Sequence, residues 1–556
     1  MMLPQQRMDR ARALRALADE TFDLLVIGGG ITGAGVAREA SLRGFAVALV
    51  EQADYASGTS SRSTKLIHGG LRYLKQFDFK LVAEAVRERQ LLLNMAPQLV
   101  EPTRFLFPVF RGDPDGLLAL RAGLTVYDLF ARLQAPIPHR MLNASAVMQR
   151  EPDVRRDGLV GGAVYTDSRT DDGRLTLAVI QSAQMSGATL ANYVVADGFL
   201  HDSGGRATGA RVTDTLAGEQ FDVRAARVLC AGGPWADELR HLEDQAAPLM
   251  LHLTKGVHVA VASERLELTH AVVMRSDDAE RRMMFAIPHG GYTYLGTTDT
   301  DYRERPESAG VLAADVAYIL AATNRTFPDA RLTEIDVAST WVGLRPLVRP
   351  PRQTRPSAVS RDYQLFHDQS GVACVAGGKL TAFRAMAEHI VSQLMPGSQS
   401  DTSRRASLAP LPGADAPLPT QQTWNELAHA TGVAPAQLRE WCGTYGSRVT
   451  EVAAHLPHQS SGDAGLDWHR AMTRYAVQYE AAQRLEDVYR RRTGLMLFSR
   501  DNGCAWLEPL ADEMAAMLGW SAERRRDEIS RTRTAIDRMF AFRVDSLTRD
   551  EPAHVG

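Results

Sequence analysis

"FDLLVIGGGITGAGVAREASLRGFAVALVE", residues 22 to 51, is the stretch that decides the fold. The apolar run that opens it is typical of a buried parallel strand, and the glycine turn leads directly into small residues suited to a closely packed helix. Gly44 predicts the end of that helix, and "FAVALVE" predicts a second strand that ends on Glu51. The stretch therefore predicts the βαβ unit that opens a doubly wound α/β domain.

Three glycines in this stretch, Gly28, Gly30 and Gly33, follow GxGxxG order. The first makes a tight turn, the second lets the backbone approach a pyrophosphate, and the third lets the helix pack on the sheet. The helix N-terminus adds free N–H groups for the phosphates. Glu51 follows Gly30 by 21 residues, where a carboxylate can bind a ribose hydroxyl. These features predict a dinucleotide site without separating FAD from NAD.

Composition limits the range of functions. The chain has 556 residues, which suggests two or three domains. Its 63 basic and 66 acidic residues leave a net charge of −3, so nucleic acid is not an expected partner and any cationic site must be a local cluster. The four cysteines have no metal-ligand spacing, so we expect reduced thiols and no metal site.

The N-terminal segment carries no secretory signal, and no apolar run reaches the length of a transmembrane helix. Residues 8 to 17 have the pattern of an amphipathic helix. We expect this segment to be a solvated leader, with a membrane anchor as the alternative.

Two later segments favour FAD over NAD. "RVLCAGGPWADEL" (227–239) and "GVACVAGGKLTAFRAMAEH" (371–389) are each a predicted strand that runs into a glycine turn. Such turns present backbone N–H groups to an anion or a polar ring edge. Together with the cationic "SRSTKLIHGGLRYL" (61–74), they give several turns able to converge on one long cofactor.

The chain resembles the FAD-dependent glycerol-3-phosphate dehydrogenases of the bacterial aerobic, quinone-linked type. The resemblance spans roughly residues 22 to 495 and rests on seven motifs, "VIGGGITGAGVAREA", "GTSSRSTKLIHGGLRYL", "AGGPW", "VGLRPLV", "SRDY", "GGKLTAFR" and "YEAAQRLEDVYRRRT". It implies an FAD-binding Rossmann-like domain, interleaved with an antiparallel-sheet substrate domain of the amino-acid-oxidase kind, and a C-terminal helical domain. The fold class is thus α/β, or α+β overall.

The resemblance also implies a set of site residues. Those expected to contact FAD are Gly28, Gly30, Gly33, Glu51, Ser60, Ser61, Lys65, Leu66, His68, Gly69, Gly232, Gly378, Leu380 and Thr381. Those expected to bind the substrate are Arg72, Tyr73, Arg345, Arg361 and Lys379. The implied reaction moves a hydride from carbon 2 of sn-glycerol 3-phosphate to FAD, which requires a base for the hydroxyl proton. His258 and His68 are the base candidates, with a slight preference for His258, and Arg345 is expected to polarise the developing alkoxide.

Domain boundaries follow from the motifs and the composition. We expect a leader over 1–20, the FAD-dependent region over 21–400, a Pro- and Ala-rich linker over 401–420 and the helical domain over 421–545. Within the FAD-dependent region, cofactor-binding segments are expected at about 21–110, 150–240 and 340–400, and the substrate sheet mainly at about 100–150 and 240–345. "YAVQYEAAQRLEDVYRRRTGLMLF" predicts a long amphipathic helix, with "RLEDVYRRR" as a solvated face carrying internal ion pairs.

The expected partners are the substrate, a membrane quinone and a second copy of the chain. The expected location is the cytoplasm, with peripheral contact to the cytoplasmic face of the inner membrane. An oxidase that passes electrons to oxygen is the near alternative, and an amine or amino-acid oxidase is a further one. A flavin-binding redox sensor without turnover is the alternative from another class.

Overall fold

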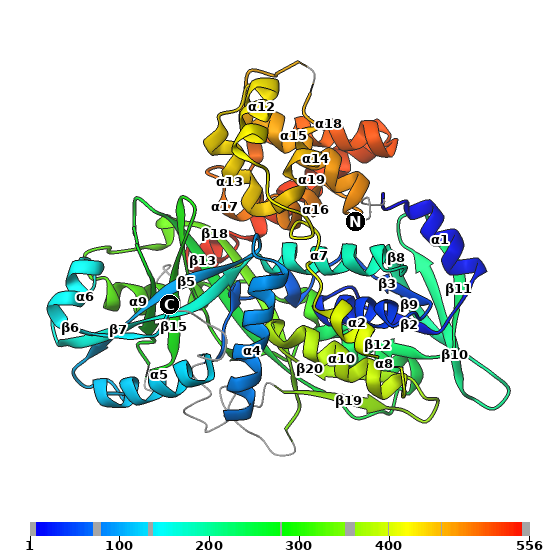
Figure 1. The fold of residues 1–556 in the computed structure, drawn as a ribbon, viewed down its shortest axis with the longest axis horizontal. Helices are drawn as coiled ribbons and strands as arrows, with labels where there is room; N and C mark the ends of the chain where they lie inside the picture. Colours follow the sequence, from blue (N-terminus) through cyan, green and yellow to red (C-terminus); the bar gives the residue numbers. More distant parts are fainter. Residues whose placement is uncertain are drawn as a thin grey trace, which may run out of the picture.

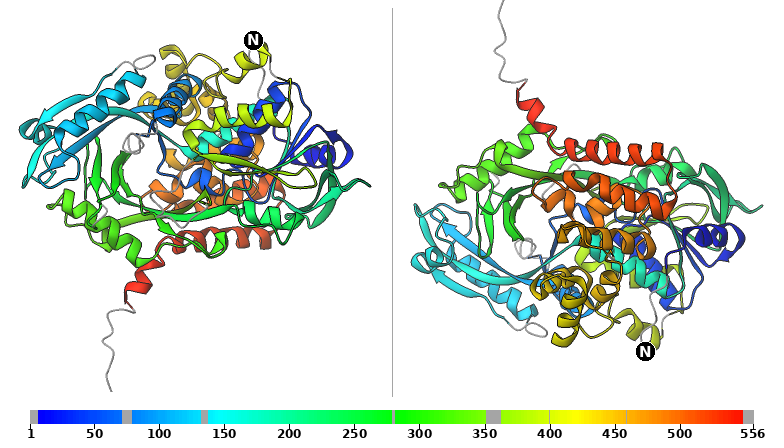
Figure 2. Two further views of the ribbon diagram at one scale, coloured as in Figure 1. Left: turned by 90° about the horizontal axis from the view of Figure 1, so that it is seen from below. Right: turned by 90° about the horizontal axis from the view of Figure 1, so that it is seen from above.

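The computed structural model describes residues 7–70, 79–131, 137–278, 281–350, 362–398, 400–457 and 459–547. Three sheets make up the N-terminal two thirds of the chain, and the C-terminal helices form one body stacked over them (Figure 1). Two further views show the same arrangement from below and from above (Figure 2).

A six-stranded sheet carries the predicted βαβ unit. Its order is β19–β20–β12–β2–β3–β8, with all neighbours parallel except the edge pair β19–β20. The strands are β2 (Leu24–Ile27), β3 (Val47–Glu51), β8 (Thr189–Asn192), β12 (Val228–Cys230), β19 (Tyr363–His367) and β20 (Ala373–Gly377). Helix α2 (Ile31–Leu42) packs against both α7 (Asp172–Met185) and α10 (Phe383–Leu394). The predicted doubly wound unit is confirmed, and the carboxyl ends of its strands meet at one edge, where ligands bind in such sheets.

The N-terminal helix α1 (Arg10–Asp19) belongs to the fold. It packs on β8 and on β11 (Glu219–Ala225), buries Leu17 completely and forms an ion pair of 2.7 Å between Arg10 and Asp214. The expectation of a solvated leader is therefore wrong for these residues, because the apolar side of the helix is covered. Strand β11 lies in a four-stranded sheet ordered β1 (Thr21–Phe22), β11, β10 (Ala207–Asp214) and β9 (Val194–His201).

The third sheet is large and mostly antiparallel, as the alternating segments predicted. Its order is β17–β13–β16–β15–β14–β5–β7–β4, with β18 paired to β13 and β6 paired to β7. The strands are β4 (Leu66–Ile67), β5 (Val100–Phe110), β6 (Arg140–Asn143), β7 (Leu159–Thr170), β13 (Leu251–Ala262), β14 (Ala271–Arg275), β15 (Met283–His289), β16 (Tyr292–Gly296), β17 (Thr300–Asp301) and β18 (Val337–Val348). Strand β7 was expected in a cofactor-binding segment, and β18 spans the expected boundary between the substrate sheet and the last of those segments. Both strands lie in this sheet because they pair along their whole length with β5 and β13.

Helices surround these sheets. They are α4 (Phe79–Met95), α5 (Leu117–Ala131), α6 (Ala144–Arg150), α8 (Ala236–Glu243) and α9 (Ala313–Thr326). Helix α5 lies on the side of the molecule away from the C-terminal helices (Figure 1).

The expected linker is not a free connector. Helix α11 (Asp401–Ser407) opens it, and the Arg38 side chain of α2 donates from Nη1 to the carbonyl of Ser407 at 3.0 Å. Further along, Leu411 is fully buried and its N–H donates to the carbonyl of Met95 at 2.7 Å. The segment therefore follows the surface of the cofactor-binding part.

The C-terminal body is helical, as predicted. It contains α12 (Gln421–Thr431), α13 (Pro435–Tyr445), α14 (Val449–Ala453), α15 (Ala464–Tyr479), α16 (Leu485–Asp487), a π-helical turn (Val488–Arg492), α17 (Leu495–Phe498), α18 (Leu507–Leu518), α19 (Ala522–Arg538) and α20 (Phe542–Leu547). The expected long helix over 475–498 is wrong, because α15 ends at Tyr479 and Ala481 has a positive φ of 53°. The solvated face expected for "RLEDVYRRR" is also wrong, since Asp487, Arg491 and Arg492 are buried.

Candidate active site

The glycine turn between β2 and α2 has no room for a side chain at Gly28 or at Gly33. Gly28 has a φ of 119°, and a Cβ atom on it would lie 2.4 Å from the carbonyl oxygen of Ala231 at the end of β12. A Cβ atom on Gly33 would lie 1.9 Å from the carbonyl oxygen of Gly28. The turn is thus held tightly against its own helix and the neighbouring strand, with the N-terminus of α2 facing the sheet edge.

Glu51 stands beside this turn at the end of β3. Its carboxylate accepts hydrogen bonds from the N–H of Gly29 at 2.6 Å and from the N–H of Ala53 at 2.9 Å. Burial raises the pKa of Glu51, although these two N–H groups oppose the rise. Each carboxylate oxygen keeps a further lone pair for a ribose hydroxyl, as the sequence predicted.

A cavity of 330 Å³ opens along this edge of the sheet. Seven of the residues expected to contact the cofactor line it, namely Gly28, Gly30, Glu51, Ser60, Gly232, Gly378 and Leu380. They come from the ends of four different strands and the loop after β3. A cavity lined by a helix N-terminus, a carboxylate and several glycine turns fits FAD, whose pyrophosphate and ribose need these groups.

The remaining cofactor candidates have other neighbours. The Nζ atom of Lys65 forms a buried ion pair with Asp172 at 2.6 Å, so its charge is committed within the protein. The N–H of Gly69 donates to Tyr127 Oη at 2.9 Å and to Asp167 Oδ1 at 3.1 Å. Ser61 is buried in the short helix Thr59–Ser61, and its hydroxyl has no hydrogen-bond partner among the described residues. The ion pair of Lys65 and the hydrogen bonds of Gly69 therefore hold the backbone of residues 59 to 70 in place.

A second cavity, of 170 Å³, adjoins the first. Both are lined by Thr59, Ser63, Pro346, Gly378, Lys379 and Leu380, so they lie side by side. The second cavity is also lined by His68, His258 and Arg345, together with Leu66 and Thr381. Four of the residues predicted for catalysis or substrate binding, from segments far apart in the chain, thus line one small space. Arg72, Tyr73 and Arg361 lie outside the described residues.

Arg345 on β18 is oriented by three acceptors. Its guanidinium donates to Asp299 Oδ1 at 2.9 Å, to Thr297 Oγ1 at 3.0 Å and to the carbonyl of Thr298 at 3.1 Å. Gly256 on β13 leaves the room it needs, since a Cβ atom there would lie 2.5 Å from Nη2. Asp299 also pairs with Arg282, at 2.8 Å, so the carboxylate is itself fixed.

His258 on β13 is buried and held on both sides. Its Nε2 lies 3.0 Å from Thr64 Oγ1, and its ring stacks on Trp341. No described residue hydrogen-bonds its Nδ1. Burial holds the pKa of His258 well below its ordinary value, and the positive charges of Arg345 and Lys65 lower it further. The imidazole is therefore neutral near pH 7, which is the form that accepts a proton.

The backbone of His68 ties two predicted segments together. Its carbonyl accepts a hydrogen bond from Thr381 Oγ1 at 3.4 Å, which joins the stretch 61–70 to the start of α10. No motif in the sequence pointed to Trp341 as the platform for His258, or to Thr64 as its partner. Only the pairing of β13 with β18, which sets His258 opposite Trp341, brings these residues together.

Known protein families match most of the chain. The family "FAD dependent oxidoreductase" matches residues 23–390, and the "C-terminal domain of alpha-glycerophosphate oxidase" matches residues 405–525. An aerobic glycerol-3-phosphate dehydrogenase of Staphylococcus saprophyticus is 36% identical over 95% of this chain and 97% of its own length. An alpha-glycerophosphate oxidase of Streptococcus pneumoniae is 34% identical over 93% and 95%, respectively.

Solved structures agree with these matches. The FAD complex of a glycerol-3-phosphate dehydrogenase from Bacillus halodurans has a TM-score of 0.79 and 31% identity, and the match covers 96% of this chain and 98% of that chain. Glycine oxidase of Geobacillus kaustophilus, with a TM-score of 0.51 and 20% identity over 67% of this chain and 94% of that one, shares the fold alone. The chain therefore belongs to the FAD-dependent glycerol-3-phosphate dehydrogenase family, and its cofactor is FAD.

Proposed function

We propose that this protein oxidises sn-glycerol 3-phosphate to dihydroxyacetone phosphate and passes the electrons to a membrane quinone. The observation that supports the substrate is the second cavity, where the cations of Arg345 and Lys379 lie with two histidines directly beside the FAD cavity. A dianionic phosphate ester needs several cations, and a guanidinium fork binds its oxygens in pairs. The names of the relatives point to the same substrate.

Each residue of the second cavity has its own part in this proposal. Lys379 binds the phosphate ester, with Arg72, Tyr73 and Arg361 as further predicted contacts. Arg345 orients the hydroxyl on carbon 2 and stabilises the negative charge that develops on its oxygen. His258 takes the hydroxyl proton, and FAD, when bound, accepts the hydride from carbon 2. His68 is the alternative base.

The quinone is the proposed acceptor, and oxygen is the second candidate. Oxygen is favoured by relatives that are named oxidases and match over nearly their full length. The deciding experiment gives the purified enzyme glycerol 3-phosphate with a ubiquinone analogue or with oxygen. We expect quinone reduction with little hydrogen peroxide. Stoichiometric peroxide and slow quinone reduction would assign the protein as the oxidase.

Flavin reduction by the substrate separates this function from a redox sensor and from an amine or amino-acid oxidase. Under anaerobic conditions, glycerol 3-phosphate is expected to bleach the flavin absorbance within the turnover time. A flavin that stays oxidised would favour a redox sensor, and bleaching by amino acids or amines alone would favour an oxidase of that class. The second cavity argues against that class, because a zwitterionic amino acid has less use for two cations than a phosphate ester has.

Membrane contact is part of the proposal, because a membrane quinone must reach the enzyme. Among the residues that the structure describes, no helix has the length and apolar character needed to cross a bilayer. Helix α5 instead exposes leucines, with Leu118 81% and Leu129 62% exposed. We propose that this face lies on the membrane surface, at the cytoplasmic side of the inner membrane. The expected homodimer stays a prediction.

A further inference from the structure

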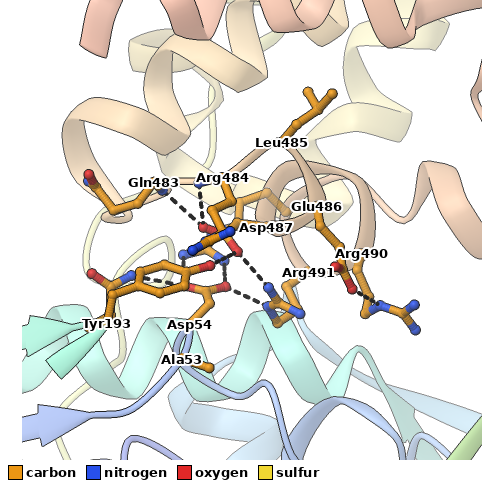
Figure 3. Close-up of polar contacts among 12 residues, drawn as sticks. Ala53, Asp54, Tyr193, Gln483, Arg484, Leu485, Glu486, Asp487, Arg490 and Arg491 are labelled. Atoms are coloured by element: carbon orange, nitrogen blue, oxygen red, sulfur yellow. Dashed lines mark hydrogen bonds and ion pairs between the residues drawn. The ribbon is translucent and has the colours of Figure 1, made fainter. Parts of the chain in front are cut away.

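Four charged side chains form ion pairs in the interior: Asp54, Asp487, Arg491 and Arg492. Figure 3 shows Asp54 on the loop that follows β3, with Asp487 and Arg491 reaching it from the C-terminal helices. Asp54 of the loop accepts hydrogen bonds from Arg491 Nε at 2.5 Å and from Arg492 Nη2 at 2.9 Å. The second Arg492 nitrogen, Nη1, also donates to Asp54. All three side chains are buried, and the two arginines come from the π-helical turn that the sequence predicted to be on the surface.

Asp487 completes the cluster. It accepts from Arg491 Nη2 at 2.7 Å, from Tyr193 Oη at 2.6 Å and from two backbone N–H groups of the turn before α16. Two carboxylates and two guanidiniums thus balance in charge. Arg492 Nη2 also donates to the carbonyl of Glu480, and Arg492 Nε has no hydrogen-bond partner among the described residues. Burial alone would raise the pKa of Asp54, but Arg492 and Arg491 outweigh it and hold that pKa below its ordinary value, which keeps the carboxylate charged.

A buried cluster of charges carries a desolvation penalty that an apolar contact between two domains does not. Taking charges out of water costs free energy that an apolar contact does not, so buried ion pairs are weak evidence for stability. They do fix geometry, because a guanidinium that donates two hydrogen bonds to one carboxylate fits it in one arrangement. The loop that carries Asp54 is therefore held in one position by the C-terminal helices.

That loop is part of the FAD cavity. Asp54 follows Glu51 by three residues, and the N–H of Ala56 donates to the carbonyl of Gly29 at 3.1 Å. The ring of Tyr55 lies against Gly29, where a Cβ atom would meet it at 2.7 Å. Farther along, Ser60 Oγ accepts from the N–H of Ile31 at 2.9 Å, at the first residue of α2. The loop thus supports the turn that faces the pyrophosphate.

We propose that Arg491 and Arg492 are positioning residues for FAD, which act through Asp54 and make the C-terminal domain a part of the cofactor site. By reciprocity, FAD in its cavity strengthens the docking of the C-terminal helices on the loop. The domain, for which the sequence suggested no chemistry, is in this view a cofactor-retention element.

The test measures release of FAD from the holoenzyme at a temperature well below unfolding. The variant is Arg492→Gln, and the matched control is Arg174→Gln. Arg174 forms a buried ion pair of 2.7 Å with the side chain of Glu480, which joins the same two domains. The carbonyl of Glu480 accepts from Arg492, but Arg174→Gln changes only the side-chain pair and leaves the hydrogen bonds of Asp54 in place. We expect FAD release about tenfold faster in Arg492→Gln and within about twofold of the parent in Arg174→Gln. With saturating FAD, the KM for glycerol 3-phosphate is expected to stay unchanged in both.

A second variant and a second measurement test the proposal even if Arg492→Gln does not fold. Arg492→Lys keeps the charge and loses the fork, and we expect it to fold and to release FAD at an intermediate rate. In the parent, removal of FAD is expected to speed amide hydrogen exchange in residues 483–492. Three results would each overturn the proposal. The Arg492 variants could release FAD at the parental rate, or Arg174→Gln could release FAD as fast as Arg492→Gln does. Amide exchange in residues 483–492 could also be the same with and without FAD.

Discussion

The imidazole of His258 lies flat on the indole of Trp341, with ring centroids 4.9 Å apart and planes inclined by 10°. The stack fixes the ring while its edges stay available, one to Thr64 and the other without a hydrogen-bond partner among the described residues. A base must be held within reach of the proton that it takes, and this arrangement holds His258 at the wall of the second cavity.

The first prediction concerns His258→Gln. We expect kcat to fall by about 10²- to 10⁴-fold with FAD still bound, because the proton acceptor is lost. The matched control is His289→Gln. His289 is half-buried, desolvation lowers its pKa to about 4, and its ring contacts Phe498 rather than Trp341. Stopped-flow flavin reduction measures both. A normal rate in His258→Gln with a slow rate in His68→Gln would move the base to His68.

A second prediction concerns stability and pH. The folded-state pKa of His258 lies below the unfolded value near 6.5, so the unfolded chain takes up a proton that the native state refuses. The contribution of His258 is therefore fully present above pH 6.5 and is lost as the pH falls. We expect the parent to lose about 1 kcal/mol relative to His258→Gln between pH 7.5 and 5.5, measured by urea unfolding of both. A pH-independent difference between the two proteins would contradict this assignment.

The glycine fingerprint could be interpreted from sequence because each of its constraints is local. β2, α2 and β3 occupy the expected residues, and the later strands β12 and β20 join the same sheet. Alternating segments likewise predicted strands such as β13 and β16. In both cases neighbours in the chain set the pattern, so a window of a dozen residues holds the information.

The buried position of the run "RLEDVYRRR" could not be predicted from its neighbours in the sequence. The charges of the run follow the spacing of a surface helix. Asp54, more than 430 residues earlier, is the distant carboxylate that pairs with both Arg491 and Arg492 in the interior. The same limit applied to His258, whose stacking partner lies on another strand. Long-range partners of buried charges leave no periodic trace in one sequence.

A third prediction tests the cations. Arg345→Ala is expected to lower kcat/KM by about 100-fold or more while leaving FAD bound, because it removes a charged hydrogen-bond donor from a buried site. Arg282 still pairs with Asp299, so the fold around the carboxylate has support. Arg345→Lys retains charge without the fork and serves as the comparison, with an intermediate loss expected. Unchanged kinetics in Arg345→Ala would show that the substrate binds elsewhere.

A fourth prediction separates folding from cofactor binding at the glycine turn. Gly30 has an extended backbone with φ of −75°, and a Cβ atom there would approach only Ser60 Oγ, at 3.1 Å. Gly30→Val is therefore expected to fold and to lack the flavin spectrum, since its side chain occupies the FAD cavity. Gly198→Val in strand β9, where a Cβ atom meets nothing within 4 Å, is the control that retains FAD. A yellow Gly30→Val protein would argue against this turn as the pyrophosphate site.

The last prediction concerns helix α5. Four exposed residues lie on one face of this helix, namely Leu118, Ala122, Thr125 and Leu129. The last three follow Leu118 by 4, 7 and 11 residues, which is the spacing of one helix face. Each leucine that enters a bilayer interface is worth about 2 kcal/mol, so two of them form a reversible anchor. We expect the double variant Leu118→Glu, Leu129→Glu to lose sedimentation with anionic lipid vesicles while its flavin is still reduced by substrate at the parental rate. Ile335→Glu, at a residue 88% exposed elsewhere on the surface, is the control that keeps vesicle binding. If the double variant instead binds vesicles as the parent does and elutes as a smaller species, the face is a contact between two copies of the chain, because charges placed at a buried protein interface separate the partners.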